Sequence, residues 1–331
     1  MTARGTGTGT LSLRWNSPAA APFGTIAVNG SGWNDAAATL SSKPTGTGRL
    51  YVTSSGGVVL DSLTFAGSGV ADVTPPSVSA TLSPATPNGA NGWYTSNGTV
   101  TVNATDNGTV ASRQRSTDGG ATWVNANTAL TVSTDGTTTV LYRATDNGGN
   151  VSQVGSVTVK LDKTQPAVAV SGVTDGATVG NSGDVTWTAT DATSGIDTVT
   201  ATVDGAAVAA GTPLALWKLS LGSHTLVVTA KDKAGLVRTT TVTFTTGTSL
   251  EILTVLTERL SREGLVTPVG EKELEKRLEQ AEKHVAAGRA AAAISQLQGF
   301  ADAAQSSTNV RDAAASAALQ RDANAVIASL R

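Results

Sequence analysis

Residues 98–106 read Gly-Thr-Val-Thr-Val-Asn-Ala-Thr-Asp, and residues 183–191 read Gly-Asp-Val-Thr-Trp-Thr-Ala-Thr-Asp, 85 positions later. In the first copy Val100, Val102 and Ala104 alternate with polar residues. This period of two is typical of a half-buried antiparallel strand. The recurrence indicates two copies of one β-rich module.

Two further anchors of the repeat keep nearly the same spacing, and turn signals separate the strand-like runs. The anchors are residues 142–146 with 228–232, and 72–78 with 162–168. Asp-Gly and Asn-Gly pairs recur between the runs, as expected for tight turns between antiparallel strands. About 85 residues of this pattern predict a seven-strand Ig-like sandwich in each copy. Prolines 75, 76 and 166 stiffen the short linkers, which predicts modules in a semi-rigid series.

The second module carries the stretches NGWYTSNGTVTVNATDNG, STDGGATWV and TTTVLYRATDNGGNV. These stretches resemble the bacterial Ig-like repeats of cell-surface and secreted proteins. The third module keeps HTLVVTAKDKAGLV and is similar to a more divergent member of the same group. The resemblance implies spacer or adhesion modules.

The composition changes abruptly near residue 249, and every glutamate of the chain lies at or after Glu251. Apolar residues then recur at helical spacing, beginning with Leu250, Leu253, Leu256 and Leu260, which predicts three or four amphipathic helices around one core. Oppositely charged residues between 271 and 283 are spaced for i,i+4 pairs on a solvated face. The stretches LTERLSREGLV, LEKRLEQAEKHVAAGRAAAAISQLQGF and DANAVIASL resemble the FIMAH-type helical domain of bacterial extracellular proteins.

The first 70 residues contain LSLRWNSP, GTIAVNGSGWNDAAATL, GTGRLYVTSSGG and VVLDSLTF. They resemble the second half of family 6 carbohydrate-binding modules, which are β-sandwich lectins. The matching elements are a Gly32-Trp33 loop, a strand from Gly46 to Tyr51 and a closing strand to Phe65. The resemblance implies that Trp33 stacks on a sugar face, whereas the alternative is an aromatic residue that only closes the sandwich end. Because only part of a module is present, we expect either a fragment of a longer polypeptide or a degenerate half-module.

The predicted fold class is therefore multidomain. Tandem all-β Ig-like sandwiches, preceded by a partial jelly-roll or lectin-like sandwich, are followed by a small all-α bundle of three or four helices. The predicted domains are 1–70, 71–163, 164–248 and 249–331.

Four aspartates follow strand ends in the two copies: Asp106, Asp146, Asp191 and Asp232. Hard oxygen ligands at the ends of tandem sandwiches make Ca²⁺ a candidate ligand. The simpler alternative is that each aspartate hydrogen-bonds the backbone of its own turn, with no cofactor bound. A second candidate surface comprises the aromatic residues Trp93, Tyr94 and Trp123, whose alternative role is packing.

Catalytic residue types are scarce in the β part of the chain. There is no cysteine in the protein, and residues 1–248 contain no glutamate and one histidine, His224. His284 lies on a charged stretch without a second metal ligand at the usual spacing. No Gly-x-Ser-x-Gly motif occurs. We expect no enzymatic activity.

The formal net charge of −2, with both signs scattered, excludes a basic surface for nucleic acid. No run of about 18 apolar residues occurs, so we expect no membrane insertion. No signal peptide follows Met1, and we expect one upstream or lost.

These observations favour a monomeric, non-catalytic spacer or accessory region, extracellular or at the cell surface. Its expected partners are neighbouring modules and a polysaccharide or cell-surface glycan. The alternative is a structural or adhesive protein with a protein or envelope partner.

Overall fold

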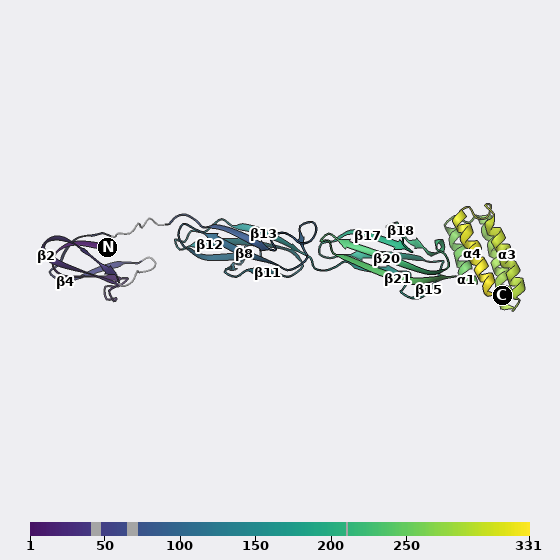
Figure 1. The fold of residues 1–331 in the computed structure, drawn as a ribbon, viewed down its shortest axis with the longest axis horizontal. Helices are drawn as coiled ribbons and strands as arrows, with labels where there is room; N and C mark the ends of the chain where they lie inside the picture. Colours follow the sequence, from purple (N-terminus) through teal and green to yellow (C-terminus); the bar gives the residue numbers. More distant parts are fainter. Residues whose placement is uncertain (41–47, 65–71, 210) are drawn as a thin grey trace. The chain divides into compact units, whose positions relative to one another are not determined.

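The structure is a computed structural model that describes residues 1–40, 48–64, 72–209 and 211–331. The chain forms two compact units, Met1–Val73 and Thr74–Arg331. Strands make up the first unit and most of the second, and four helices follow the last strand (Figure 1). The predicted fold class, β-sandwich modules followed by a small helical bundle, is confirmed.

The first unit is built on one five-stranded sheet with the order β3-β2-β1-β4, in which β5 also pairs with β1. The strands are β1 (Thr2–Trp15), β2 (Gly24–Ala37), β3 (Thr39–Leu40), β4 (Leu50–Gly56) and β5 (Val59–Thr64). Alternate residues of β1 and β2 are buried, among them Leu11, Leu13, Ile26 and Val28. The predicted strands around Gly46 and Phe65 fall partly outside the described residues, because Gly46, Thr47 and Phe65 do so.

The second module contains two facing sheets with the orders β10-β9-β12-β13-β7 and β11-β8-β6. Its strands are β6 (Ser77–Ser83), β7 (Trp93–Tyr94), β8 (Gly98–Thr105), β9 (Val110–Ser116), β10 (Val124–Asn125), β11 (Leu130–Val132), β12 (Gly136–Asp146) and β13 (Gly155–Leu161). Val100 and Val102 on β8 are buried and Thr99 and Thr101 are half-buried, which confirms the predicted alternation.

The second module has eight strands, so the prediction of seven is wrong. The chain leaves the smaller sheet after β6, and Trp93–Tyr94 then pairs in parallel with β13 of the larger sheet. Proline residues at 84 and 87 lie between these two strands. Because proline donates no hydrogen bond to a ladder, the first strand is split between the two sheets.

The third module repeats this arrangement with sheets β14-β16-β19 and β15-β21-β20-β17-β18. Its elements are β14 (Ala167–Ser171), β15 (Ala177–Gly180), β16 (Asp184–Thr190), β17 (Ile196–Val203), β18 (Ala206–Val208), β19 (Leu214–Ala215), the short 3-10 helix η1 (Leu216–Lys218), β20 (Gly222–Asp232) and β21 (Val237–Gly247). Strand β15 again pairs in parallel with the last strand, β21. The shared topology follows from the shared sequence pattern.

Helices α1 to α4 form the C-terminal bundle. They are α1 (Leu250–Arg262), α2 (Pro268–Ala286), α3 (Ala290–Gln305) and α4 (Ala313–Ser329). Side chains of Ser249, Thr267 and Asp312 accept hydrogen bonds from the first turns of α1, α2 and α4, so each of these helices begins at a polar cap. No helix in the described part of the chain has the length and apolar character that a bilayer span requires.

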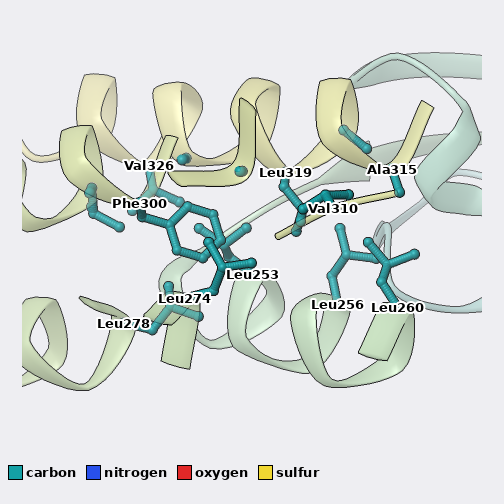
Figure 2. Close-up of a cluster of buried hydrophobic side chains, with 14 of the residues drawn as sticks. Leu253, Leu256, Leu260, Leu274, Leu278, Phe300, Val310, Ala315, Leu319 and Val326 are labelled. Atoms are coloured by element: carbon teal, nitrogen blue, oxygen red, sulfur yellow. The ribbon is translucent and has the colours of Figure 1, made fainter. Parts of the chain in front are cut away.

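The bundle core consists of leucine and other apolar side chains from all four helices (Figure 2). Leu253, Leu256 and Leu260 of α1 lie on one face and are fully buried. Within the same core Leu253 lies beside Leu274 of α2 and Phe300 of α3, whereas Leu256 and Leu260 lie toward Val310 and Ala315. This is the helical spacing that the sequence predicted.

Trp217 of η1, in the third module, is also part of the bundle core. Its side chain is 3% exposed. The third module and the helices therefore share buried apolar surface, which a sequence boundary at residue 249 does not reveal.

Candidate metal centre

Asp162, Asp191 and Asp232 meet where the second module joins the third. Asp162 follows β13, Asp191 follows β16, and Asp232 is the last residue of β20. Each contributes one carboxylate oxygen to a group whose atoms all lie within 4.8 Å of one another. The sequence indicated Asp191 and Asp232 but missed Asp162, although an aspartate also opens the matching linker segment at residue 72.

Asp191 and Asp162 are held in place by backbone amides of the turn after β16. Oδ1 of Asp191 accepts hydrogen bonds of 2.8 Å from the amides of Ser194 and Gly195. Oδ2 of Asp162 accepts a bond of 3.2 Å from the same Ser194 amide. One turn of the third module thus orients a carboxylate that directly follows the last strand of the second module.

Asp232 is the most unusual member of this cluster. It is fully buried. Its Oδ1 accepts a hydrogen bond of 2.8 Å from the amide of Leu236, whereas its buried Oδ2 has no partner among the described residues. Burial raises the pKa of the Asp232 carboxyl, and the negative charges of Asp162 and Asp191 raise it further, against the opposing effect of the Leu236 amide. A buried carboxylate oxygen without a hydrogen-bond partner is unfavourable unless it binds a cation or a proton.

The two modules are also joined by bonds outside the aspartate cluster. The amide of Ala90 donates to the carbonyl oxygen of Ala234 over 2.7 Å. The side-chain amide of Asn91 donates to the carbonyl oxygen of Lys233 over 2.9 Å. A loop of the second module thus binds the turn that directly follows Asp232.

Asp106 and Asp146, the other two predicted aspartates, lie close together within the second module, with carboxylate oxygens within 4.8 Å. Asp106 accepts a bond of 3.0 Å from the amide of Gly108, and Asp146 accepts one of 2.8 Å from the amide of Asn150. A further bond from the Asn150 side chain is the main cause of the lowered pKa of Asp146. These contacts are of the kind that the simpler interpretation expects, although Oδ1 of Asp106 is buried without a partner among the described residues.

Trp33 lies within strand β2, so its placement in a loop is wrong. Pairing with β1 passes from Gly7↔Gly30 to Gly5↔Asn34, so residues 31–33 oppose a single residue of β1. This enlarged bulge interrupts the ladder and turns side chains away from it. Trp33 is 50% exposed, which leaves much of the indole accessible.

The aromatic residues of the second module differ in their surroundings. Tyr94 is 3% exposed and belongs to the module core. The guanidinium of Arg143 covers the ring of Trp123 at 4.1 Å. Trp93 is half-buried on β7. Packing therefore accounts for Tyr94, and cation–π stacking for Trp123.

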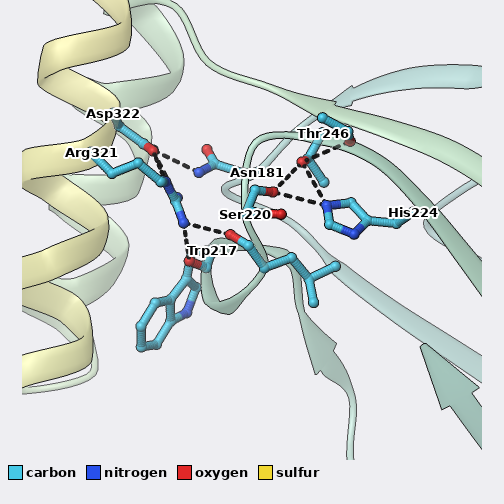
Figure 3. A network of polar contacts seen from close by, with 9 residues as sticks. Asn181, Trp217, Ser220, His224, Thr246, Arg321 and Asp322 are labelled. Atoms are coloured by element: carbon cyan, nitrogen blue, oxygen red, sulfur yellow. Dashed lines mark hydrogen bonds and ion pairs between the residues drawn. The ribbon is translucent and has the colours of Figure 1, made fainter. Parts of the chain in front are cut away.

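His224 is enclosed near the end of the third module (Figure 3). Its Nδ1 lies 2.7 Å from Oδ2 of Asp204, and its Nε2 lies 2.8 Å from the carbonyl oxygen of Ser220 and 3.2 Å from Oγ1 of Thr246. The ring is 3% exposed. His284 lies half-buried on α2. Both ring nitrogens of His224 thus have partners within the fold, and Thr246 itself donates to the Ser220 carbonyl over 2.7 Å.

Polar contacts join the third module to the helical bundle beside this histidine (Figure 3). Arg321 of α4 donates to the carbonyl oxygens of Trp217 and Leu219. Arg259 of α1 forms an ion pair of 2.8 Å with Asp184 of β16. Burial raises the pKa of Asp322, the neighbour of Arg321. Apolar and polar contacts thus coincide at this junction.

Comparison with solved structures gives similarities of low identity. Fibronectin(III)-like modules of Clostridium thermocellum CbhA are 17% identical, cover 51% of this chain and 94% of their own, and give a TM-score of 0.25. A Ca²⁺-stabilized adhesin of an Antarctic bacterium is 20% identical over 73% of this chain and 65% of its own, with a TM-score of 0.25. A tetra-tandem repeat from the extending region of a large adhesion protein is 19% identical over 72% and 67%, with a TM-score of 0.29. No curated protein sequence matches the chain.

The helical segment has a more specific relationship. Residues 250–328 match the model of the FIMAH domain family. The match spans α1 to α4 almost completely. The C-terminal bundle is therefore a FIMAH domain, which confirms the resemblance predicted from its sequence.

Proposed function

We propose that the chain is a non-catalytic spacer and accessory region of a secreted or cell-surface modular protein. The observation that carries this proposal is the direct bonding between successive modules. The Ala90–Ala234 backbone bond links the two sandwiches, and Trp217 places a side chain of the third module in the core of the FIMAH domain. Modules joined by buried and hydrogen-bonded contacts keep a restricted orientation, which a spacer requires.

Distance measurements between modules test this role. The chain contains no cysteine, so Thr137→Cys and Thr241→Cys provide unique spin-label sites on exposed positions of the second and third modules. We expect a narrow distance distribution by pulsed electron paramagnetic resonance. A matched pair within the third module, Thr178→Cys and Thr200→Cys, defines the width for a rigid body. A distribution several times broader than that of the control contradicts the spacer role.

The non-catalytic part of the proposal is supported by the surroundings of the scarce catalytic residue types. His224 is buried, and its ring nitrogens face Asp204 and the Ser220 carbonyl. Each of these contacts occupies a nitrogen that a general base needs free. We expect no release of reducing sugars from a panel of polysaccharides, and reproducible release by the purified chain contradicts the assignment.

Glycan binding through Trp33 is a second candidate function, and the exposed indole on β2 favours it. A flat aromatic face presents a stacking surface for the C–H groups of a sugar ring. Retention of the chain on insoluble plant polysaccharides should be lost in Trp33→Ala and kept in Val59→Ala, a change at a residue of the same unit that is 56% exposed. Absence of retention in the unmodified chain favours a structural or adhesive role with a protein or envelope partner.

A further inference from the structure

We propose that Asp162, Asp191 and Asp232 bind one calcium ion at the junction between the second and third modules. One carboxylate comes from the end of the second module, and the other two come from the turn after β16 and from the last residue of β20 in the third module. An ion held by all three would tie the modules together through bonds that neither module makes alone.

The orphaned oxygen of Asp232 is the first observation for this site. Oδ2 is buried and has no hydrogen-bond partner in the described part of the chain. Among the described residues, no Lys or Arg forms an ion pair with any of the three aspartates. The neighbouring Lys163 points elsewhere: its Nζ lies 4.0 Å from the Asp135 carboxylate and 2.7 Å from the carbonyl oxygen of Ser133. Buried carboxylates without a counter-charge are strongly unfavourable unless a cation or a proton compensates them.

The spacing of the three oxygens is the second observation. Ligands of one calcium ion lie about 2.3–2.6 Å from it, so two of them are at most about 5 Å apart. The three carboxylate oxygens all lie within 4.8 Å of one another, which is inside this range. The group has the dimensions of a shared coordination shell.

The donor set selects a hard cation. All three side chains are carboxylates, and no cysteine or histidine is part of the group, whereas zinc sites usually include such ligands. Calcium accepts six to eight oxygens in flexible geometry, and magnesium demands a near-octahedral shell and retains more water. Three aspartates from separate segments of the chain, already partly held by backbone amides, favour the flexible geometry of calcium.

The electrostatic surroundings of the three carboxylates also favour a bound cation. Burial and the nearby carboxylates of Asp162 and Asp191 both oppose a negative charge on Asp232. A divalent ion would reverse both effects by placing positive charge among the three groups. The alternative is a proton on Asp232 that is shared with a neighbouring carboxylate, and the experiment below separates the two.

Calorimetric titration of the full chain, stripped with EDTA, tests the site directly. We expect Ca²⁺, added as calcium chloride, to bind, and Mg²⁺, added as magnesium chloride, to bind at least about tenfold more weakly. In Asp232→Asn the stoichiometry should fall by one ion, or the affinity of one site should drop at least about tenfold, since loss of even an outer-shell partner of a metal costs about 10–100-fold. Asp197→Asn is the matched control, because Asp197 is an exposed residue of the same module that pairs with Lys231.

The thermal midpoint gives a second readout that does not depend on the heat of binding. Calcium should raise the midpoint of the unmodified chain and of Asp197→Asn, and it should raise that of Asp232→Asn by less. If Asp232 only shares a proton, all three proteins respond equally to calcium, and the proposal is overturned. Absence of calcium binding to the unmodified chain overturns it as well.

Stiffening of the spacer by calcium rests on the proposed function, whereas binding of the ion does not. With the Thr137→Cys and Thr241→Cys labels, we expect the distance distribution to narrow when calcium replaces EDTA. A distribution that stays broad despite calorimetric binding contradicts the spacer role and leaves the metal site standing. A narrow distribution without calcium binding contradicts the metal site alone.

Discussion

The side-chain amide of Asn181 donates a hydrogen bond of 2.6 Å to Oδ2 of Asp322. Asn181 follows β15 of the third module, Asp322 lies on α4, and neither residue has exposed surface. Arg321 pairs with the other carboxylate oxygen at 2.7 Å. The FIMAH domain is therefore anchored to the sandwich by a buried carboxylate with donors on both sides (Figure 3).

Replacement of Asn181 by alanine should weaken this anchor. Asp322 would lose a donor while remaining buried, and hydrogen bonds to charged groups contribute about 1.5–3 kcal/mol. We expect the free energy of unfolding to fall by about 2 kcal/mol in urea denaturation. Asn324→Ala, at an exposed position of α4 two residues after Asp322, should change the free energy of unfolding by less than about 0.5 kcal/mol. Equal effects of the two variants would show that the buried bond has no special weight.

Adjacent residues of α1 should differ sharply in their tolerance of alanine. Leu256 is fully buried in the bundle core, whereas Val255 is 42% exposed. Leu256→Ala removes packed methyl groups and leaves a cavity, so a loss of about 2–5 kcal/mol in the free energy of unfolding is expected. Val255→Ala should cost less than about 1 kcal/mol. A small loss for Leu256→Ala, measured by chemical denaturation, argues against the core described for the bundle.

Gly270 should not accept alanine although it lies in a helix. A Cβ atom at this position would overlap with the backbone of Asn309. The resulting shift should cost about 1–3 kcal/mol, more than the roughly 1 kcal/mol that alanine gains over glycine in helix propensity. Val269→Ala, at an adjacent residue that is 72% exposed, provides the control. A higher thermal midpoint for Gly270→Ala than for the unmodified chain would disprove the close approach.

The Asp204–His224 pair should make stability depend on pH in the acid range. The hydrogen bond from His224 is the main cause of the lowered pKa of Asp204. A carboxyl whose pKa is lower in the folded than in the unfolded state stabilises the fold above the unfolded value of about 3.9, and this contribution is lost as the pH falls through the folded pKa. Asp204→Asn should therefore lower the thermal midpoint at pH 6, and the deficit should shrink toward pH 2.5.

Thermal melts between pH 2.5 and 6 check this expectation, with Asp197→Asn as the control. Asp197 forms only an exposed ion pair of 3.9 Å with Lys231, whose contribution should be small throughout. A deficit of Asp204→Asn that is constant across this range shows that the pair acts without a change in protonation.

Much of the architecture could be predicted from local patterns. The alternation at 98–106 became β8, with Val100 and Val102 in the core. The helical leucines became α1, and Pro268 begins α2 after the cap of Thr267. These features depend on residues a few positions apart, so period and capping chemistry are sufficient to predict them.

The strand split and the bulge needed information beyond a short window. The extra strand β7 exists because Trp93–Tyr94 finds a partner in β13, more than 60 residues away. Trp33 lies in a strand because β1 pairs with residues on both sides of the bulge. The local sequence does not identify either pairing partner. Glycine and proline occur both in loops and in interrupted strands, so they do not distinguish the two.

By itself, the sequence determined the repeat, the alternation of faces and the change from β to α structure, because each is written in spacing along the chain. Only the tertiary structure decided that Asp162 joins Asp191 and Asp232, and that Trp217 completes the FIMAH core. The physical reason is that burial and charge clustering depend on which chain ends and turns pack together. Such contacts join residues separated by dozens of positions, and no periodicity encodes them.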